Sequence, residues 1–273
     1  MLGGASVCRP GGTGGRGIVT VGPLRRWLGL LGLDEIRCSC CLRPFSPSVT
    51  EMSGGDGSLP LCPECGKLLT PFTGPRCPLC GFPFPAGAAA SVGGATPPCG
   101  ACLARRPPWR ALAYHGVYKG ALRDLVLRFK FGGELALGRL LAGWLENAAL
   151  CLPAPDVLVG MPQHPAHLRR RGFNQAHELA RALHAATHIP FRPDILVRRC
   201  DSAPQSSLNA QLRAATVRGV FGVAAPVSGM RIWLVDDVMT TGSTLREAAQ
   251  TLLGSGAAEV CALVIGRTPR VIA

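Results

Sequence analysis

A short apolar run that ends in two adjacent carboxylates constrains the fold of this chain most strongly. The run covers residues 232–235, the carboxylates are Asp236 and Asp237, and a hydroxyl-rich loop follows at 240–244. Because the run is too short for a typical helix, it predicts a buried parallel strand, and a helical pattern begins at 245–253. In such a strand–loop–helix unit, backbone N–H groups and the positive end of the helix surround the loop, so we expect an anion there.

The composition of this loop suits a phosphate at one end and a diol at the other. Gly242 lets the backbone approach an anion closely, and the threonines and the serine supply hydroxyl donors. The two carboxylates suit ribose hydroxyls, or a magnesium ion held through water. The segment therefore predicts a ribose 5-phosphate site. An acidic pair that only caps the next helix is the simpler alternative, but capping requires neither two acids nor this run of hydroxyls.

Residues 232–244 resemble the signature of the type I phosphoribosyltransferases: four apolar residues, two acidic residues and then Val-x-Thr-Thr-Gly-Ser-Thr. The resemblance implies a parallel α/β sheet with flanking helices, with phosphoribosyl pyrophosphate as the donor and a magnesium ion bound with it. It implies ribose contacts for Asp236 and Asp237. The residues implied to hold the 5-phosphate are Thr240, Thr241, Gly242, Ser243 and Thr244.

A second segment concentrates positive charge. The apolar strand predicted at 156–162 ends in a turn and leads into a loop with three consecutive arginines at 169–171, before a helix at 176–187. Such a loop favours an anion, although a solvated basic loop is the alternative. By the resemblance, the residues that meet the pyrophosphate are Met161, Pro162, Arg169, Arg170, Arg171 and Gly172. Lys130, beside two glycines at the end of a predicted helix at 120–131, could reach the ligand or lie at the surface.

Four Cys-x-x-Cys pairs precede this region. About 20 residues separate the first pair from the second, and about 18 separate the third from the fourth. These gaps are close to those of four-cysteine zinc ribbons. Each pair presents two thiolates to one tetrahedral ion, so we predict two structural zinc sites. Consecutive pairing is our prediction, and an interleaved order stays open. The predicted ligands are Cys38, Cys41, Cys62, Cys65, Cys77, Cys80, Cys99 and Cys102, with Cys40 as a spare ligand.

These patterns divide the chain into three parts. Residues 1–37 predict a disordered tail and a short amphipathic helix, 38–105 a double zinc ribbon and 106–273 a phosphoribosyltransferase-like domain. Strands predicted near residues 157, 196, 232 and 260 alternate with helices, which favours one parallel sheet with its ligand at the carboxyl ends of the strands. A further strand is predicted at 111–117, and further helices at 134–150 and 208–217.

The cysteine pairs, the stretch from Pro162 to Gln175 and the acidic motif together resemble the ComF family. That family joins a double zinc ribbon to a phosphoribosyltransferase-like domain and is linked to competence and the handling of incoming DNA. The resemblance covers residue 38 to the end. Thr216 and Gln163 depart from the family pattern. Further matched positions are Gln205, Leu208, Arg213, Arg218, Gly219 and Phe221.

The net charge of +13 favours a polyanionic ligand, either a polyphosphate or nucleic acid. Two zinc ions on eight thiolates would lower this charge to about +9. Few aromatic residues interleave the basic ones, which argues against base stacking as the main DNA contact. No run of eighteen apolar residues is free of charge, so we expect no membrane span. Thirteen cysteines without an export signal indicate a reducing cytoplasm.

Three hypotheses about function follow from the sequence. The first is a phosphoribosyltransferase, a pentosyl-transferring enzyme, that acts on an unidentified nitrogen nucleophile. The second is a non-catalytic sensor that binds phosphoribosyl pyrophosphate or a nucleotide in the same pocket. The third is a DNA-uptake or DNA-processing adaptor that binds single-stranded DNA or a competence protein. The sequence carries no signature of the acceptor or of the oligomeric state.

Overall fold

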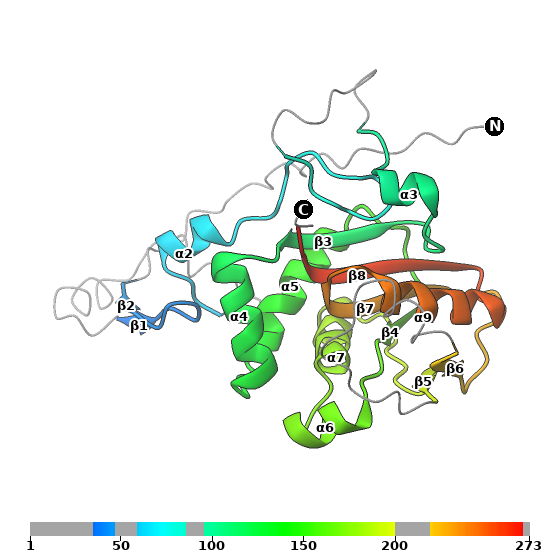
Figure 1. The fold of residues 1–273 in the computed structure, drawn as a ribbon. Helices are drawn as coiled ribbons and strands as arrows, with labels where there is room; N and C mark the ends of the chain where they lie inside the picture. Colours follow the sequence, from blue (N-terminus) through cyan, green and yellow to red (C-terminus); the bar gives the residue numbers. More distant parts are fainter. Residues whose placement is uncertain (1–34, 47–58, 86–95, 200–218, 270–273) are drawn as a thin grey trace. The chain divides into compact units, whose positions relative to one another are not determined.

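The structure, a computed structural model, describes residues 35–46, 59–85, 96–199 and 219–269. The chain separates into two compact units, residues 1–70 and 71–273 (Figure 1). The predicted tail and amphipathic helix before residue 35, the predicted helix at 208–217 and the family positions Gln205, Leu208, Arg213, Thr216 and Arg218 lie outside the described residues. The domain bounds 38–105 and 106–273 stay a prediction.

The first unit contains three short elements around one cysteine group. Strands β1 (Ile36–Arg37) and β2 (Pro44–Phe45) pair antiparallel. Helix α2 (Pro63–Leu68) begins with proline at its first position, where the missing N–H costs nothing. Cys38 and Cys65 are buried in this unit. The cysteine group therefore lies at the centre of these short elements.

The second unit is built on a four-stranded parallel sheet with the order β3-β8-β7-β4. Its strands are β3 (Leu112–Val117), β4 (Val157–Gly160), β7 (Arg231–Met239) and β8 (Glu259–Arg267). All three pairings are parallel, with Ile232 opposite Val260 and Val157 in the central registers. The predicted parallel α/β sheet with flanking helices is confirmed.

Helices cover both faces of this sheet. Helices α4 (Gly120–Phe131), α5 (Leu137–Ala149) and α7 (Gln175–Thr187) belong to one layer, in which α5 and α7 pack against each other and against the strands. Helix α9 (Ser243–Gly254) packs on β7 and β8 in front of the sheet (Figure 1). Ile232 and Leu234 share one core cluster with α9, because alternate residues of a strand point to the same face.

The strand predicted near residue 196 does not belong to the parallel sheet, so that part of the prediction is wrong. Strand β5 (Leu196–Arg198) pairs antiparallel with β6 (Phe221–Val223), and β3 is the fourth strand of the main sheet. Between α7 and β5, the described chain forms one isolated bridge with β4, between Phe191 and Leu158. Pro190 and Pro193 flank that bridge, and a residue without an N–H cannot continue a ladder.

Two smaller elements complete the second unit: α3 (Gly100–Ala104) and α6 (Pro165–Arg171). Among the described residues, no helix is long and apolar enough to cross a membrane.

Candidate functional site

The predicted phosphate loop lies between β7 and α9. Strand β7 continues through both carboxylates to Met239, and α9 begins at Ser243. The loop proper is therefore shorter than predicted, and Ser243 and Thr244 form the first turn of the helix. Gly242 occupies the cap position and offers no side chain to the first N–H groups of this 12-residue helix. Ser243 N makes a long 3.4 Å contact to Thr241 Oγ1, and the positive end of a helix without a side-chain cap suits an anion.

The backbone conformation at position 242 favours glycine, and the space around it is small. Its φ of 77° lies in the left-handed region, which side chains rarely adopt. A Cβ there would also collide with the methyl group of Met239 and would touch the ring of Trp109. The loop therefore rests directly on the core beneath it.

The acidic pair forms the second part of the site. Asp237 is 8% exposed, and its N–H donates to Asp236 Oδ1 at 2.9 Å. Burial, followed by the charge of Asp237, raises the pKa of Asp236 to about 7, while Lys130 acts in the opposite direction. Lys130 Nζ lies 2.8 Å from Asp237 Oδ2. A cation beside the pair therefore favours the charged form of Asp236.

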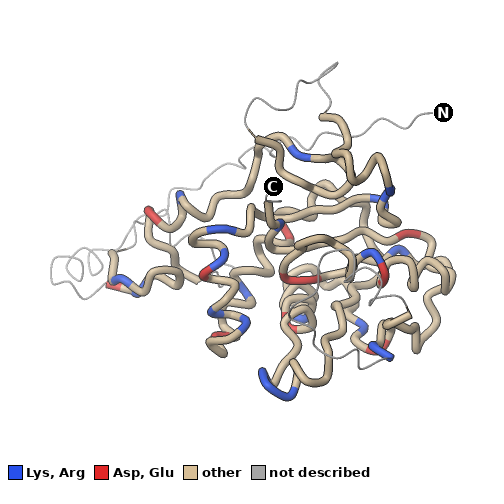
Figure 2. The backbone as a smooth tube through the Cα atoms, viewed as in Figure 1, with Lys and Arg blue, Asp and Glu red and all other residues tan. Residues whose placement is uncertain are grey.

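The arginine run is helical, and its prediction as a loop is wrong. Helix α6 begins at Pro165, His164 Nδ1 accepts from Ala166 N at 3.1 Å, and Gly172 ends the helix with a φ of 80°. Proline at the start and a left-handed glycine at the end are typical helix boundaries, and both were present in the sequence. Figure 2 shows the run as a basic block at the end of α6.

Only one of the three arginines turns inward. Arg171 is half-buried, and its guanidinium lies 4.4 Å from the centroid of the Phe131 ring. Burial lowers the pKa of Arg171, whereas the nearby charge of Asp237 raises it. Arg169 and Arg170 are exposed. The structure thus brings Arg171, Lys130 and Asp237 together and leaves the other two arginines on the outside of α6.

Gln175 connects these parts, a role that the sequence did not indicate. Its side chain is fully buried, and Oε1 accepts from Arg171 Nη1 at 3.2 Å and from the Gln163 amide. Its Nε2 donates to the carbonyl of Lys130 at 3.4 Å. One buried amide therefore sets the relative positions of the helix ends that carry the two cations.

The turn at Met161 and Pro162 is also fixed by its neighbours. Met161 N donates to Val235 O at 2.9 Å, which places the turn beside the start of the acidic pair. Asn174 Nδ2 donates to Met161 O at 3.0 Å, while Asn174 Oδ1 accepts from Ala176 N and caps α7. The cap of α7 thus holds the turn in place.

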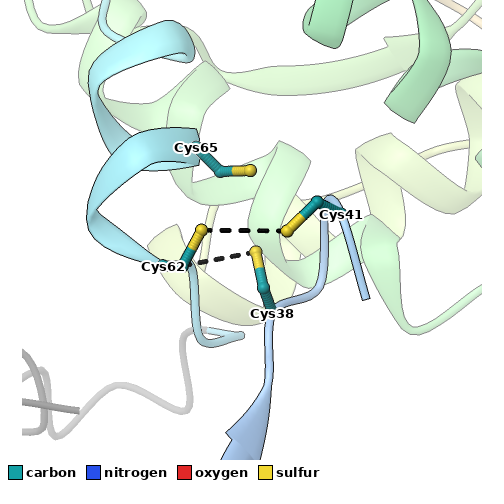
Figure 3. A group of neighbouring side chains, drawn as sticks. All are labelled: Cys38, Cys41, Cys62 and Cys65. Atoms are coloured by element: carbon teal, nitrogen blue, oxygen red, sulfur yellow. Dashed lines mark hydrogen bonds between the residues drawn. The ribbon is translucent and has the colours of Figure 1, made fainter. Parts of the chain in front are cut away.

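Each cysteine group has the dimensions of a zinc site. The sulfurs of Cys38, Cys41, Cys62 and Cys65 lie within 4.8 Å of one another and face a common centre (Figure 3). Cys41 Sγ lies 3.8 Å from Cys62 Sγ, and Cys80 Sγ lies 3.6 Å from Cys99 Sγ. A tetrahedral zinc ion at 2.3 Å from each sulfur separates the sulfurs by about 3.8 Å. The second group, Cys77, Cys80, Cys99 and Cys102, is equally compact, so both groups could hold zinc, in consecutive order along the chain.

Hydrogen bonds favour the thiolate at two of these cysteines, Cys38 and Cys77. Burial tends to raise the pKa of Cys38, but N–H groups of Cys62, Cys41 and Cys40 outweigh it and lower this pKa to about 6. The side chain of Cys80, with N–H groups nearby, lowers the pKa of Cys77 to about 4. Burial raises the pKa of Cys65, so a full set of thiolates requires a cation at the centre.

The fold and this site define a class: a phosphoribosyltransferase fold with two tetracysteine groups before it in sequence. The model of the phosphoribosyl transferase domain matches residues 155–270. The chain is 35% identical over 214 residues to the DNA utilization protein YhgH of Salmonella typhi, covering 76% of this chain and 90% of that protein. It is 32% identical to competence protein F of Haemophilus influenzae, with 73% and 87% covered. It is 29% identical to competence protein ComFC of Bacillus subtilis, with 83% and 92% covered.

This chain belongs to the ComF family. The resemblance seen in the sequence is thereby confirmed, together with the type I phosphoribosyltransferase fold.

Proposed function

We propose that the protein binds phosphoribosyl pyrophosphate with magnesium and transfers the phosphoribosyl group to a nitrogen nucleophile. The observation that carries the proposal is the meeting of three differently charged parts. These are an uncapped helix start at Gly242, the carboxylates Asp236 and Asp237, and the cations Lys130 and Arg171. In a donor of this kind, the helix start would suit the phosphate, the carboxylates the diol and the cations the diphosphate.

In this proposal, different residues bind different parts of the donor. N–H groups at the start of α9 and the hydroxyls of Thr240, Thr241, Ser243 and Thr244 would hold the 5-phosphate. Asp236 and Asp237 would hold the ribose hydroxyls, and their oxygens are the ligand type that magnesium prefers alongside substrate phosphates. Magnesium would supply positive charge to the departing diphosphate.

The cations of the site would act on the leaving group. Arg171 and Lys130 would stabilise negative charge that grows on the diphosphate as its bond to the sugar breaks. The turn at Met161 and Pro162 and the exposed Arg169, Arg170 and Gly172 would meet the diphosphate from the side of α6. Since the main requirement is charge stabilisation, no strong base is obligatory. We place this activity in the cytoplasm, with two zinc ions in the cysteine groups.

The test is calorimetry with phosphoribosyl pyrophosphate and magnesium. We expect wild type to bind and Asp236→Asn/Asp237→Asn to lose at least about tenfold in affinity, since each charge-assisted hydrogen bond contributes roughly 1.5–3 kcal/mol. Asp124→Asn, an exposed carboxylate on α4, is the matched control. Equal binding by wild type and the double variant would remove the pocket assignment. A pyrophosphate-release screen over nitrogen nucleophiles then separates transfer from sensing, since binding without release favours the sensor.

A second candidate function is a role in DNA handling. Its support is the family: relatives carry the names DNA utilization protein and competence protein. Single-stranded DNA would bind through phosphate contacts, so its affinity would fall steeply with salt. Binding is measured by fluorescence anisotropy at low and physiological salt. Absence of binding at low salt would leave a protein partner as the remaining form of this hypothesis.

A further inference from the structure

A buried arginine connects the second cysteine group to the phosphate loop. Arg267, at the end of β8, is fully buried. Its Nε donates to the carbonyl of Cys80 at 3.2 Å, and its Nη1 donates to the carbonyl of Met239 at 3.1 Å and to that of Thr240. A guanidinium is planar and rigid, so these bonds fix the cysteine turn relative to the start of the loop.

Trp109 makes a second, independent link between the same two parts. Its indole N–H donates to the carbonyl of Leu79, between two of the cysteines, at 2.8 Å. The ring is 4% exposed, and a ring carbon lies 3.5 Å from the position that a Cβ on Gly242 would take. The indole therefore spans the distance from the cysteine turn to the glycine of the loop.

Arg246, in the first turns of α9, adds a third link. Its guanidinium lies 5.8 Å from the centroid of the Trp109 ring. Its Nη1 and Nη2 donate to the carbonyls of Arg106 and Arg105, at 2.6 and 3.2 Å, just beyond the last cysteine of the group. The helix that would hold the phosphate is thus fastened to the segment that leaves the metal site.

Charge favours the same arrangement. A zinc ion with four thiolates carries a net charge of about −2. Arg267 and Arg246 place two positive charges beside this group and beneath the loop, where they also attract a bound phosphate. Since the four cysteines share one core cluster with Trp109, Met239 and Leu245, loss of the metal would disturb the packing under the loop directly.

We propose that Arg267 and Trp109 are positioning residues through which metal occupancy of the Cys77–Cys80–Cys99–Cys102 group sets the order of the phosphate loop and its affinity for a sugar phosphate. The part that concerns affinity rests on the proposed function of the loop. The part that concerns loop order does not.

The experiment measures loop order first, without ligand. Hydrogen–deuterium exchange is followed in peptides that cover residues 238–246 of the full-length, zinc-loaded protein. Trp109→Phe removes one indole hydrogen bond and keeps an aromatic ring. Trp233→Phe is the matched control, because its indole N–H also donates to a backbone carbonyl, that of Pro153, at 2.9 Å within the same unit. We expect exchange in the loop to rise about tenfold in Trp109→Phe, the change that follows from losing one buried hydrogen bond, and less than about twofold in Trp233→Phe. Arg267→Lys is expected to act like Trp109→Phe.

The metal itself is tested with one variant from each group. Cys99→Ser and Cys62→Ser each remove a ligand, and only the first is expected to increase exchange in the loop. Affinity for ribose 5-phosphate is then measured by calorimetry, with an expected loss of about three- to tenfold in Trp109→Phe and in Cys99→Ser.

The outcomes separate the two proposals. Unchanged loop exchange in Trp109→Phe overturns the coupling, whatever the sugar phosphate does, and this variant decides the matter if Arg267→Lys or Cys99→Ser fails to fold. Altered loop exchange in Trp109→Phe keeps the coupling even if wild type binds neither ribose 5-phosphate nor magnesium–phosphoribosyl pyrophosphate, a result that would remove the proposed function.

Discussion

Lys130 forms an ion pair with Asp237, at 2.8 Å between Nζ and Oδ2, and so joins the end of α4 to the acidic motif of β7. Both side chains are largely buried, at 17% and 12% exposed. A magnesium–diphosphate ligand that uses Asp237 must displace this lysine, and the lysine can then bind the diphosphate instead. The ion pair thus gives the Asp237 side chain a partner before the ligand arrives.

Replacement of this lysine tests its second role. We expect Lys130→Met to weaken magnesium–phosphoribosyl pyrophosphate binding about tenfold, because a charge-assisted hydrogen bond to the diphosphate is lost. Lys119→Met, at the other end of α4 and exposed, is expected to bind like wild type. Titration calorimetry measures both. Tighter binding by Lys130→Met would mean that the lysine only competes with the ligand.

The arginines of α6 differ in orientation and therefore in expected effect. Arg171→Gln removes the cation that contacts Gln175 and lies near Asp237, so we expect about a tenfold loss of affinity for inorganic pyrophosphate. Arg169→Gln changes an exposed side chain on the same helix, and we expect a loss below about threefold. Equal effects of the two variants would show that α6 binds as a diffuse basic surface.

Zinc content tests the pairing of the cysteines. Wild type is expected to hold about two zinc ions per chain by elemental analysis. Cys41→Ser/Cys62→Ser alters one group twice and should retain about one ion, whereas Cys41→Ser/Cys99→Ser alters both groups and should retain none. The two double variants carry the same number of changes, so each controls for the other. In an interleaved order Cys41 would belong to a different group from both Cys62 and Cys99, so loss of both ions from each double variant would indicate that order.

The raised pKa of Asp236 makes stability depend on pH. In the unfolded chain this carboxyl loses its proton near 3.8, whereas in the folded protein it keeps the proton up to about 7. Its contribution to stability is therefore full at low pH and is lost as pH rises toward 7. We expect Asp236→Asn to flatten this decline and to be more stable than wild type at about pH 8, without magnesium. Urea unfolding at about pH 5.5 and pH 8 measures the difference, with Asp124→Asn as control. A parallel decline in Asp236→Asn would show that other groups cause it.

The sequence predicted those features that short segments determine. Helix α4 has the predicted bounds, because its apolar face shows its extent and the glycines after Phe131 mark its end. The spacing of the cysteines predicted both cysteine groups. The prediction that β5 joins the parallel sheet was wrong. Its apolar pattern indicates a strand but not its neighbour, and Pro190 and Pro193 limit pairing with β4 to the bridge at Phe191. Helix α6 was missed although Pro165 and Gly172 mark its ends.

The contacts made by single residues at long range could not be predicted. Gln175 joins segments 45 residues apart, and Arg267 reaches a carbonyl 187 residues before it in the chain. Arg267 lies in no motif, and the family stretch that contains Gln175 does not indicate its contacts, because a buried amide or guanidinium is recognised only by the carbonyls and side chains that the fold brings to it. For Lys130 the sequence offered one indication, its position beside two glycines, and left open whether it lies at the site or at the surface. The ion pair with Asp237 places it at the site.

The order of strands in the sheet has a consequence for how the protein is made. Among the described strands, β3 has one neighbour in the sheet, β8, which is also the last strand along the chain. On the ribosome the first cysteine group, complete by residue 65, can take up its metal early. The second group packs with Trp109 and Tyr114, which follow it directly, but the hydrogen bond from Arg267 to the carbonyl of Cys80 forms only after β8 is made. If both groups bind zinc, we therefore expect the first to be complete earlier in synthesis than the second, which gains its contact with Arg267 only after β8.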